Sequence, residues 1–135
     1  MELGQVEDYA VRALVDLALH PGARIREIAA RTSVPVPHLT KVLQSLARAG
    51  IVETMRGRAG GTRLAREPAE IRLREVMEAV QGPARLFRCP RRGRGCPCAP
   101  DCAIYQLFAN LQGQITAQLE TVRISDLLHT CPKQR

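Results

Sequence analysis

The chain has 135 residues, the size of one compact domain or of one domain with an oligomerising arm, and its hydrophobic content of 45% excludes wholesale disorder. No apolar run reaches ~18 residues, and the first residues lack the basic and apolar regions of a secretory signal. We therefore expect a cytoplasmic protein with no membrane partner. The 20 Lys and Arg exceed the 13 Asp and Glu, and the net charge of +7 favours a nucleic acid as partner.

The first fifty residues have the pattern of three helices. Apolar side chains recur three and four residues apart through residues 6–18, which predicts a helix that ends at Pro21-Gly22. A short helix follows at 26–31. The prolines after it cannot continue a helix, because proline lacks the amide donor and clashes with the preceding turn. A third helix is predicted at 37–49, and Gly50 suits its left-handed cap.

A β-hairpin is predicted after the third helix. Residues 51–55 are rich in β-branched side chains, residues 62–64 form a second short strand, and the glycines between them suit a hairpin tip. A further helix is predicted at 73–80. Helices followed by such a hairpin are typical of a winged helix-turn-helix domain, so the predicted fold class is mainly α with a small β-hairpin wing. We assign this DNA-binding domain to residues 1–82.

The predicted third helix carries the first set of candidate functional residues. In helix-turn-helix proteins, the N-terminal residues of the second helix of the motif enter the major groove, where base edges are distinguishable. Apolar positions such as Leu39 and Val42 face inward, which leaves the other side of the helix for DNA. The residues expected there are Pro37, His38, Thr40, Lys41 and Gln44.

Arginines are concentrated in the predicted wing, where no acidic residue occurs between Arg56 and Arg66. We expect Arg56, Arg58 and Arg63 to contact DNA, along the backbone or in the minor groove. The alternative is a solvated surface on a protein-interaction module, because winged helices also serve that role. The coincidence of pattern, charge and hairpin favours DNA binding.

Four cysteines lie in residues 83–102, a loop that we treat as a separate segment. They are Cys89, Cys96, Cys98 and Cys102, and five Arg accompany them. Only Cys98 and Cys102 have the close spacing of a zinc knuckle, whereas an iron–sulfur cluster suits the wider intervals and the cationic surroundings. The residues favour a cluster, and a zinc staple or buried free thiols stay the alternatives. Cys131 is predicted to be a lone thiol.

A long helix is predicted at 103–124. Its apolar stripe recurs at steps of three and four residues, at Ile104, Phe108, Leu111, Ile115, Leu119 and Val122. A chain of this length has little else to cover such a stripe, so we expect the helix to pair with its copy in a homodimer. Residues 125–135 are expected to form a C-terminal tail.

These segments together resemble one family. The matching stretches are residues 7–14, 38–43 and 52–64, and the cysteine loop that leads into a long helix. They resemble the bacterial iron–sulfur winged-helix regulators that include IscR and NsrR, over nearly the whole chain and closer to the NsrR-like branch. The resemblance implies a homodimer that binds a double-stranded DNA operator.

The resemblance also implies a set of cluster ligands. In this family three loop cysteines and one non-cysteine residue hold the cluster, which here implies Cys89, Cys96, Cys102 and Asp8 of the partner subunit. The first cysteine interval holds six residues instead of the usual five, and Cys98 is an extra thiol that is a candidate substitute ligand. A 4Fe–4S cluster is the preferred cofactor, with a 2Fe–2S cluster as the alternative.

The expected function is a transcriptional repressor whose operator affinity is controlled by a cluster that senses nitric oxide or redox stress. Two alternatives stay open. One is a regulator of cluster assembly or of general redox state, and the other is a zinc-stabilised adaptor for protein partners. The sequence contains no activated nucleophile and no phosphate-cradling loop, so neither enzyme activity nor a small-molecule substrate is expected.

Overall fold

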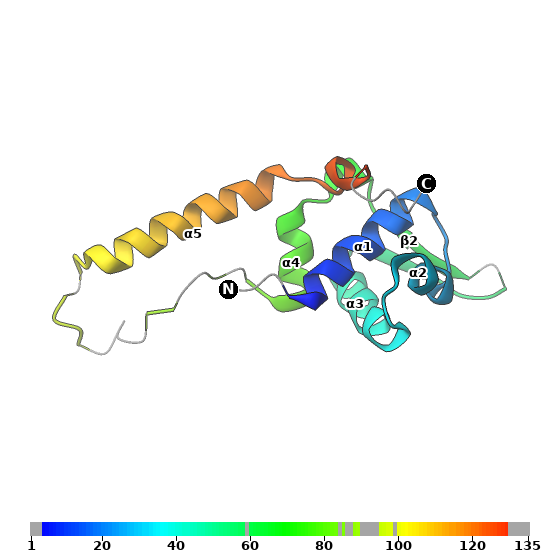
Figure 1. Cartoon of the computed structure of the whole chain (residues 1–135), viewed down its shortest axis with the longest axis horizontal. Helices are drawn as coiled ribbons and strands as arrows, with labels where there is room; N and C mark the ends of the chain where they lie inside the picture. The colour runs from blue at the N-terminus through cyan, green and yellow to red at the C-terminus, as the bar shows by residue number, and fades with distance from the viewer. Residues whose placement is uncertain are drawn as a thin grey trace.

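The computed structural model describes residues 4–58, 60–83, 85, 88–89, 95–98 and 100–129. Its elements, in chain order, are α1 (Gln5–Leu19), α2 (Ile25–Thr32), α3 (Val36–Arg48), β1 (Val52–Met55), β2 (Gly61–Leu64), the 3-10 helix η1 (Pro68–Glu70), α4 (Leu73–Gln81), α5 (Ala103–Thr121) and the 3-10 helix η2 (Ile124–Leu127). Figure 1 shows α1–α4 and the hairpin gathered at one end, with α5 extending away from them. The predicted fold class is confirmed. Within the described ranges, no helix is long and apolar enough to cross a membrane.

The hydrophobic core lies where α1 packs against α2, α3 and α4. Leu14, Leu17, Ile28, Leu39 and Leu46 are all at most 1% exposed. The helical spacing that predicted the apolar face of the first helix is therefore confirmed over most of its length, although Val6, the first residue of that face, is 39% exposed. Burial of these large side chains supplies most of the stability, at about 1.5–3 kcal/mol for each side chain removed from water.

The helix-turn-helix is formed by α2 and α3. Ser33 ends α2 in the left-handed conformation, with φ of 59°, and α3 begins at Val36 with Pro37 in its first turn. Both helices start one residue earlier than the sequence predicted, and in α3 this is possible because a proline is compatible with a first helical turn. Gly50 has φ of 73°, so the predicted left-handed end of the third helix is confirmed.

The hairpin pairs β1 with β2 antiparallel, with Glu53 opposite Arg63. The second strand begins one residue earlier than predicted, and it also pairs with the loop between α1 and α2. Gly22 N donates to Thr62 O (3.0 Å), and Thr62 N donates to Ala23 O (2.9 Å). A Cβ at Gly61 would overlap the Gly22 carbonyl, so only glycine allows the two backbones to approach. The base of the wing is thereby fixed to the helical domain.

The chain returns to this domain after α5. Leu73 N donates to Val122 O (2.9 Å), and Ile124, which begins η2, is fully buried. The predicted long helix thus ends at Thr121 rather than 124, and the segment expected to be a tail starts within a packed 3-10 helix. Cys131, predicted to be a lone thiol, lies outside the described residues.

Two arginines hold the end of α5, namely Arg72, which immediately precedes α4, and Arg74, which lies in its first turn. The Glu120 carboxylate accepts from Arg72 Nη1 (2.9 Å) and Arg74 Nη1 (2.6 Å). The hydrogen bond from Arg74, followed by that from Arg72, lowers the pKa of Glu120 below its ordinary value, against the opposing effect of desolvation. This ion-pair network fixes the direction in which α5 leaves the helical domain.

Candidate nucleic-acid interface and cysteine loop

The first turns of α3 present an outward face that agrees with the sequence pattern. Of the predicted DNA-contact residues on this helix, Pro37, His38, Lys41 and Gln44 are exposed, and Thr40 is half-buried. Thr40 Oγ1 donates to Val36 O (2.9 Å), which leaves its oxygen lone pairs for an incoming donor. Burial of Leu39 (0%) against α1 holds this face toward solvent.

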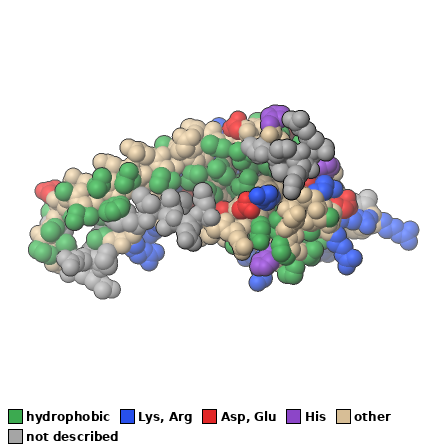
Figure 2. Space-filling view, viewed as in Figure 1, with side chains coloured by type: hydrophobic (Ala, Val, Ile, Leu, Met, Phe, Trp, Pro, Cys, Tyr) green, Lys and Arg blue, Asp and Glu red, His purple; other side chains and the backbone are tan. Residues whose placement is uncertain are grey.

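The three predicted wing arginines have different surroundings. Arg56 and Arg58 lie exposed near the hairpin tip, at the end of the molecule where Figure 2 shows Lys and Arg side chains projecting. Arg63 lies on β2, and its Nε donates to Glu53 Oε2 (3.0 Å) of the opposite strand. The charge of Arg63 is therefore partly balanced within the wing.

A hollow of about 400 Å³ lies between the wing and the exposed side of α3 that carries the predicted DNA-contact residues, which we call the recognition face. It brings Thr40 and Gln44 of α3 together with Thr54 and Thr62 of the hairpin, and Arg24 also lines it. Sequence reasoning did not single out Arg24. Its Nη2 donates to the main-chain carbonyl of Arg58 (2.5 Å), a contact across 34 residues that no local pattern could have indicated.

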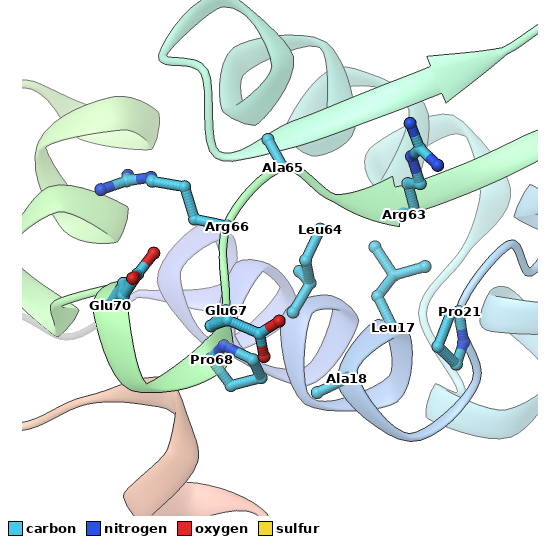
Figure 3. A pocket seen from close by; sticks show the side chains of 10 residues that line it. All are labelled: Leu17, Ala18, Pro21, Arg63, Leu64, Ala65, Arg66, Glu67, Pro68 and Glu70. Carbon is cyan, nitrogen blue, oxygen red and sulfur yellow. The ribbon is translucent and has the colours of Figure 1, made fainter.

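A second hollow, of about 430 Å³, lies beside β2 and is lined by the end of α1, by β2 and by residues 65–70. Figure 3 shows its lining, in which Arg66 extends toward α4, where Nη1 contacts Glu75 Oε1 (3.2 Å). Of the predicted site residues, this hollow includes only Arg63. It is therefore separate from the recognition face.

The predicted ligand Asp8 is exposed in the first turn of α1, where its Oδ2 accepts from Arg12 Nε (2.8 Å). The neighbouring Tyr9 contacts the ring of His38 in α3, with 5.8 Å between the ring centroids. Glu7 is 3% exposed, and its Oε2 has no hydrogen-bond partner among the described residues. The first turn of α1 therefore contacts the first turn of the recognition helix.

A buried ion pair joins α2 to α1. Asp16 is fully buried in α1, and Arg31 donates to both of its oxygens, from Nε (2.7 Å) and Nη2 (2.9 Å). The hydrogen bond from Arg31 to Asp16 raises the pKa of the guanidinium above its ordinary value. This bidentate contact fixes α2 against the helix that carries Asp8.

The described cysteines lie between α4 and α5 as free thiols. Cys89, Cys96 and Cys102 are half-buried, Cys98 is exposed, and Cys102 immediately precedes α5. Soft thiolates are suitable ligands for an iron–sulfur cluster, so the chemistry of this donor set fits the predicted cofactor. In the described part of the single chain, however, no three His, Cys, Asp or Glu side chains converge as a metal site. The accompanying Arg91, Arg92 and Arg94 lie outside the described residues.

Comparison with known proteins covers the winged helix, the cysteine loop and α5 in one match. A family model, Rrf2, described as an iron-dependent transcriptional regulator, matches residues 3–130. The chain belongs to the Rrf2 family. It is 33% identical over 132 residues to the HTH-type transcriptional regulator NsrR of Shouchella clausii, covering 95% of this chain and 89% of that protein.

Solved structures share the complete fold of this Rrf2 chain. IscR of T. potens superposes with a TM-score of 0.74 at 24% identity, covering 95% of this chain and 86% of that one. CymR, the global cysteine regulator of B. subtilis, superposes with a TM-score of 0.81 at 19% identity, covering 97% and 98%. The predicted resemblance to the IscR and NsrR regulators is confirmed, and the Rrf2 chain is a transcriptional regulator of a DNA-binding family, not an enzyme.

Proposed function

We propose that this Rrf2 chain is a homodimeric repressor whose affinity for an operator duplex is controlled by an iron–sulfur cluster that reacts with nitric oxide or another oxidant. The carrying observation is the placement of free thiols directly before the arm helix α5, in a chain that is 33% identical to a regulator named NsrR. The proposal has three parts, namely a DNA surface, a dimer and a ligand set.

The DNA surface consists of the exposed side of α3 and the wing. His38, Lys41 and Gln44 offer hydrogen-bonding groups at the N-terminal part of α3, which is the part that reads base edges in helix-turn-helix proteins. Arg56 and Arg58 supply positive charge at the wing tip for phosphates or the minor groove. A symmetric dimer would place two such surfaces on successive turns of the duplex, about 34–36 Å apart.

The partner that covers α5 is a second copy of the chain. The helix has 19 residues, about 28 Å at 1.5 Å per residue, yet none of its residues is buried. Ile104 and Leu107 are 68% and 57% exposed, and Figure 2 shows hydrophobic side chains along its length. An apolar stripe on a protruding helix favours pairing with the same helix of another protomer, which removes both stripes from water.

The ligand set consists of Cys89, Cys96 and Cys102 of one protomer and Asp8 of the partner subunit, with Cys98 as a substitute ligand. A bound cluster supplies iron atoms that react with nitric oxide and oxidants. Among the described residues of a single chain no three such donors converge, so binding of the cluster would have to bring the cysteines together, and a fourth ligand from the second protomer is compatible with this. The exposed Asp8 is suited to that role, since it needs only to exchange its contact with Arg12 for the new ligand. A carboxylate is a harder and weaker partner for iron than thiolate, so this ligand is the one most easily lost.

Side chains of α1 connect Asp8 to the recognition helix. Tyr9 follows Asp8 directly and packs on His38, so a movement of the first turn of α1 changes the position of the first turn of α3. The Asp16–Arg31 pair holds α2 firmly on α1, which restricts the movement to the N-terminal ends of α1 and α3. If Asp8 were lost as a ligand, this movement would lower affinity for the operator.

Air-free purification tests the ligand set. The wild type is expected to contain iron and acid-labile sulfide and to absorb in the visible. The double variant Cys96→Ser, Cys98→Ser removes a ligand together with its substitute and is expected to lose all three signals, and Cys98→Ser alone serves as the matched control that keeps them. Colourless protein with stoichiometric zinc and no salt-dependent DNA binding would indicate the adaptor instead. A cluster that responds to oxidants or to iron supply but not to nitric oxide would indicate the regulator of cluster assembly or redox state.

A further inference from the structure

We propose that Arg24 is a further DNA-contact residue. It binds a phosphate at the point where one DNA backbone passes the hollow between α3 and the wing. This inference rests on the proposed DNA binding and adds a residue from a third segment, the loop before α2. The helix and the wing were the two segments that the sequence indicated.

Arg24 is placed by both the helical domain and the wing. It precedes α2 with an extended backbone (φ −81°, ψ 155°), and its side chain reaches across to the hairpin tip, where Nη2 donates to Arg58 O. The adjoining main chain is held to β2 by the hydrogen bonds of Gly22 and Ala23 with Thr62. The guanidinium therefore has a defined position between the two DNA-binding elements.

The chemistry around Arg24 suits an anion. Among the described residues that line the hollow of about 400 Å³, Arg24 is the one with a charged side chain. Most of the lining is apolar, and the side chains of Thr40, Gln44, Thr54 and Thr62 supply its other polar groups. Among the described residues no carboxylate forms an ion pair with Arg24, in contrast to Arg63, which pairs with Glu53. A guanidinium has five N–H donors in a planar fork, and the contact with Arg58 O uses one of them. The remaining donors are available for the bidentate contact that phosphate oxygens favour.

The salt dependence of DNA binding separates a phosphate contact from a purely structural role. The full-length protein is titrated with a mixed-sequence duplex at several salt concentrations, and the slope of log Kd against log salt is compared between wild type and Arg24→Gln. One lost phosphate contact lowers the magnitude of the slope by ~0.9, so the affinity advantage of the wild type should shrink about threefold between about 50 and 200 mM salt. Arg24→Lys keeps the charge and is expected to keep the slope.

Arg123→Gln is the matched control. Its guanidinium also donates to a distant main-chain carbonyl, that of Ala69 (3.3 Å), but it lies beside η1 and η2, and its loss should leave the slope unchanged. Melting curves of each variant establish that it is folded. Arg24→Gln with weaker binding but an unchanged slope would show that Arg24 only tethers the wing, and would overturn the proposal. A reduced slope in Arg24→Lys would also overturn it. If the wild type shows no salt-dependent binding, the proposed DNA binding itself fails, and the assignment of Arg24 falls with it.

Discussion

The ring of Tyr9 meets the ring of His38 edge to face, with centroids 5.8 Å apart and planes inclined at 64°. Tyr9 lies one residue from Asp8 in α1, and His38 lies in the first turn of α3. Tyr9 therefore links Asp8, a proposed cluster ligand, to His38, a proposed DNA-contact residue. In the proposed function it transmits the state of the cluster to the recognition helix.

Tyr9→Leu is expected to weaken this coupling. Edge-to-face ring pairs contribute about 1 kcal/mol beyond burial, a factor of about five in an equilibrium. The ratio of operator affinities between cluster-loaded and cluster-free protein should fall by about this factor. Tyr9→Phe retains the ring contact and is the control. Binding titrations of both forms of each variant measure the ratio, and an equal ratio in wild type and Tyr9→Leu would rule out this route.

The wing arginines should contribute unequally to DNA binding. Arg58→Ala removes an exposed charge and should lower the salt slope by ~0.9. Arg63→Ala removes a guanidinium that is already paired with Glu53 at 3.0 Å, so its effect on the slope should be less than half as large. The measurement is the salt dependence of duplex binding for both variants. Equal effects of the two substitutions would contradict this ranking of the wing residues.

Removal of Arg31 should destabilise the domain strongly. Arg31→Ala leaves the fully buried Asp16 carboxylate without its bidentate partner, at an expected cost of about 2–4 kcal/mol in the free energy of unfolding. The exposed pair of Arg63 and Glu53 provides the comparison, since Arg63→Ala should cost less than about 1 kcal/mol. Urea denaturation measures both. The interpretation of Asp16 and Arg31 as the joint between α1 and α2 would fail if Arg31→Ala were no more costly than Arg63→Ala.

Periodic patterns predicted most of the fold. The i, i+3, i+4 recurrence that indicated α1 and α3 reports which side chains are buried, and Leu14 and Leu39 are fully buried. Glycine and proline marked the ends of elements, since Gly50 and Gly82 both have positive φ. The outward residues of α3 followed directly from this, because the face opposite the buried stripe must be exposed.

Contacts between residues distant in sequence were beyond such reasoning. Arg24 meets Arg58 across 34 residues, and Arg74 meets Glu120 across 46. Neither contact follows from a local spacing, because each depends on how whole elements pack. The charged Asp16 is fully buried near the C-terminal end of α1, and its partner Arg31 is identifiable only once α2 lies on α1.

Acid should loosen the end of α5. The pKa of Glu120 is lowered chiefly by the hydrogen bond from Arg74, so its ionised form stabilises the fold above the ordinary value of 4.5, and this contribution is lost as the pH falls through the lowered pKa. The stability difference between wild type and Glu120→Gln should therefore be constant above about pH 4.5 and shrink below it. Glu70→Gln, on the exposed surface of η1, is the control. Urea midpoints at a series of pH values measure the difference, and a difference independent of pH would contradict the ion-pair account.

The central claim is that an iron–sulfur cluster controls how tightly the winged helix binds DNA. The most direct measurement follows visible absorption and operator affinity in the same air-free sample during titration with nitric oxide, with an operator duplex selected from random sequence. The account predicts that cluster absorption and affinity decline together, and that Asp8→Ala loses its cluster at lower nitric oxide than the wild type. Operator affinity that stays constant while the cluster absorption disappears would contradict it.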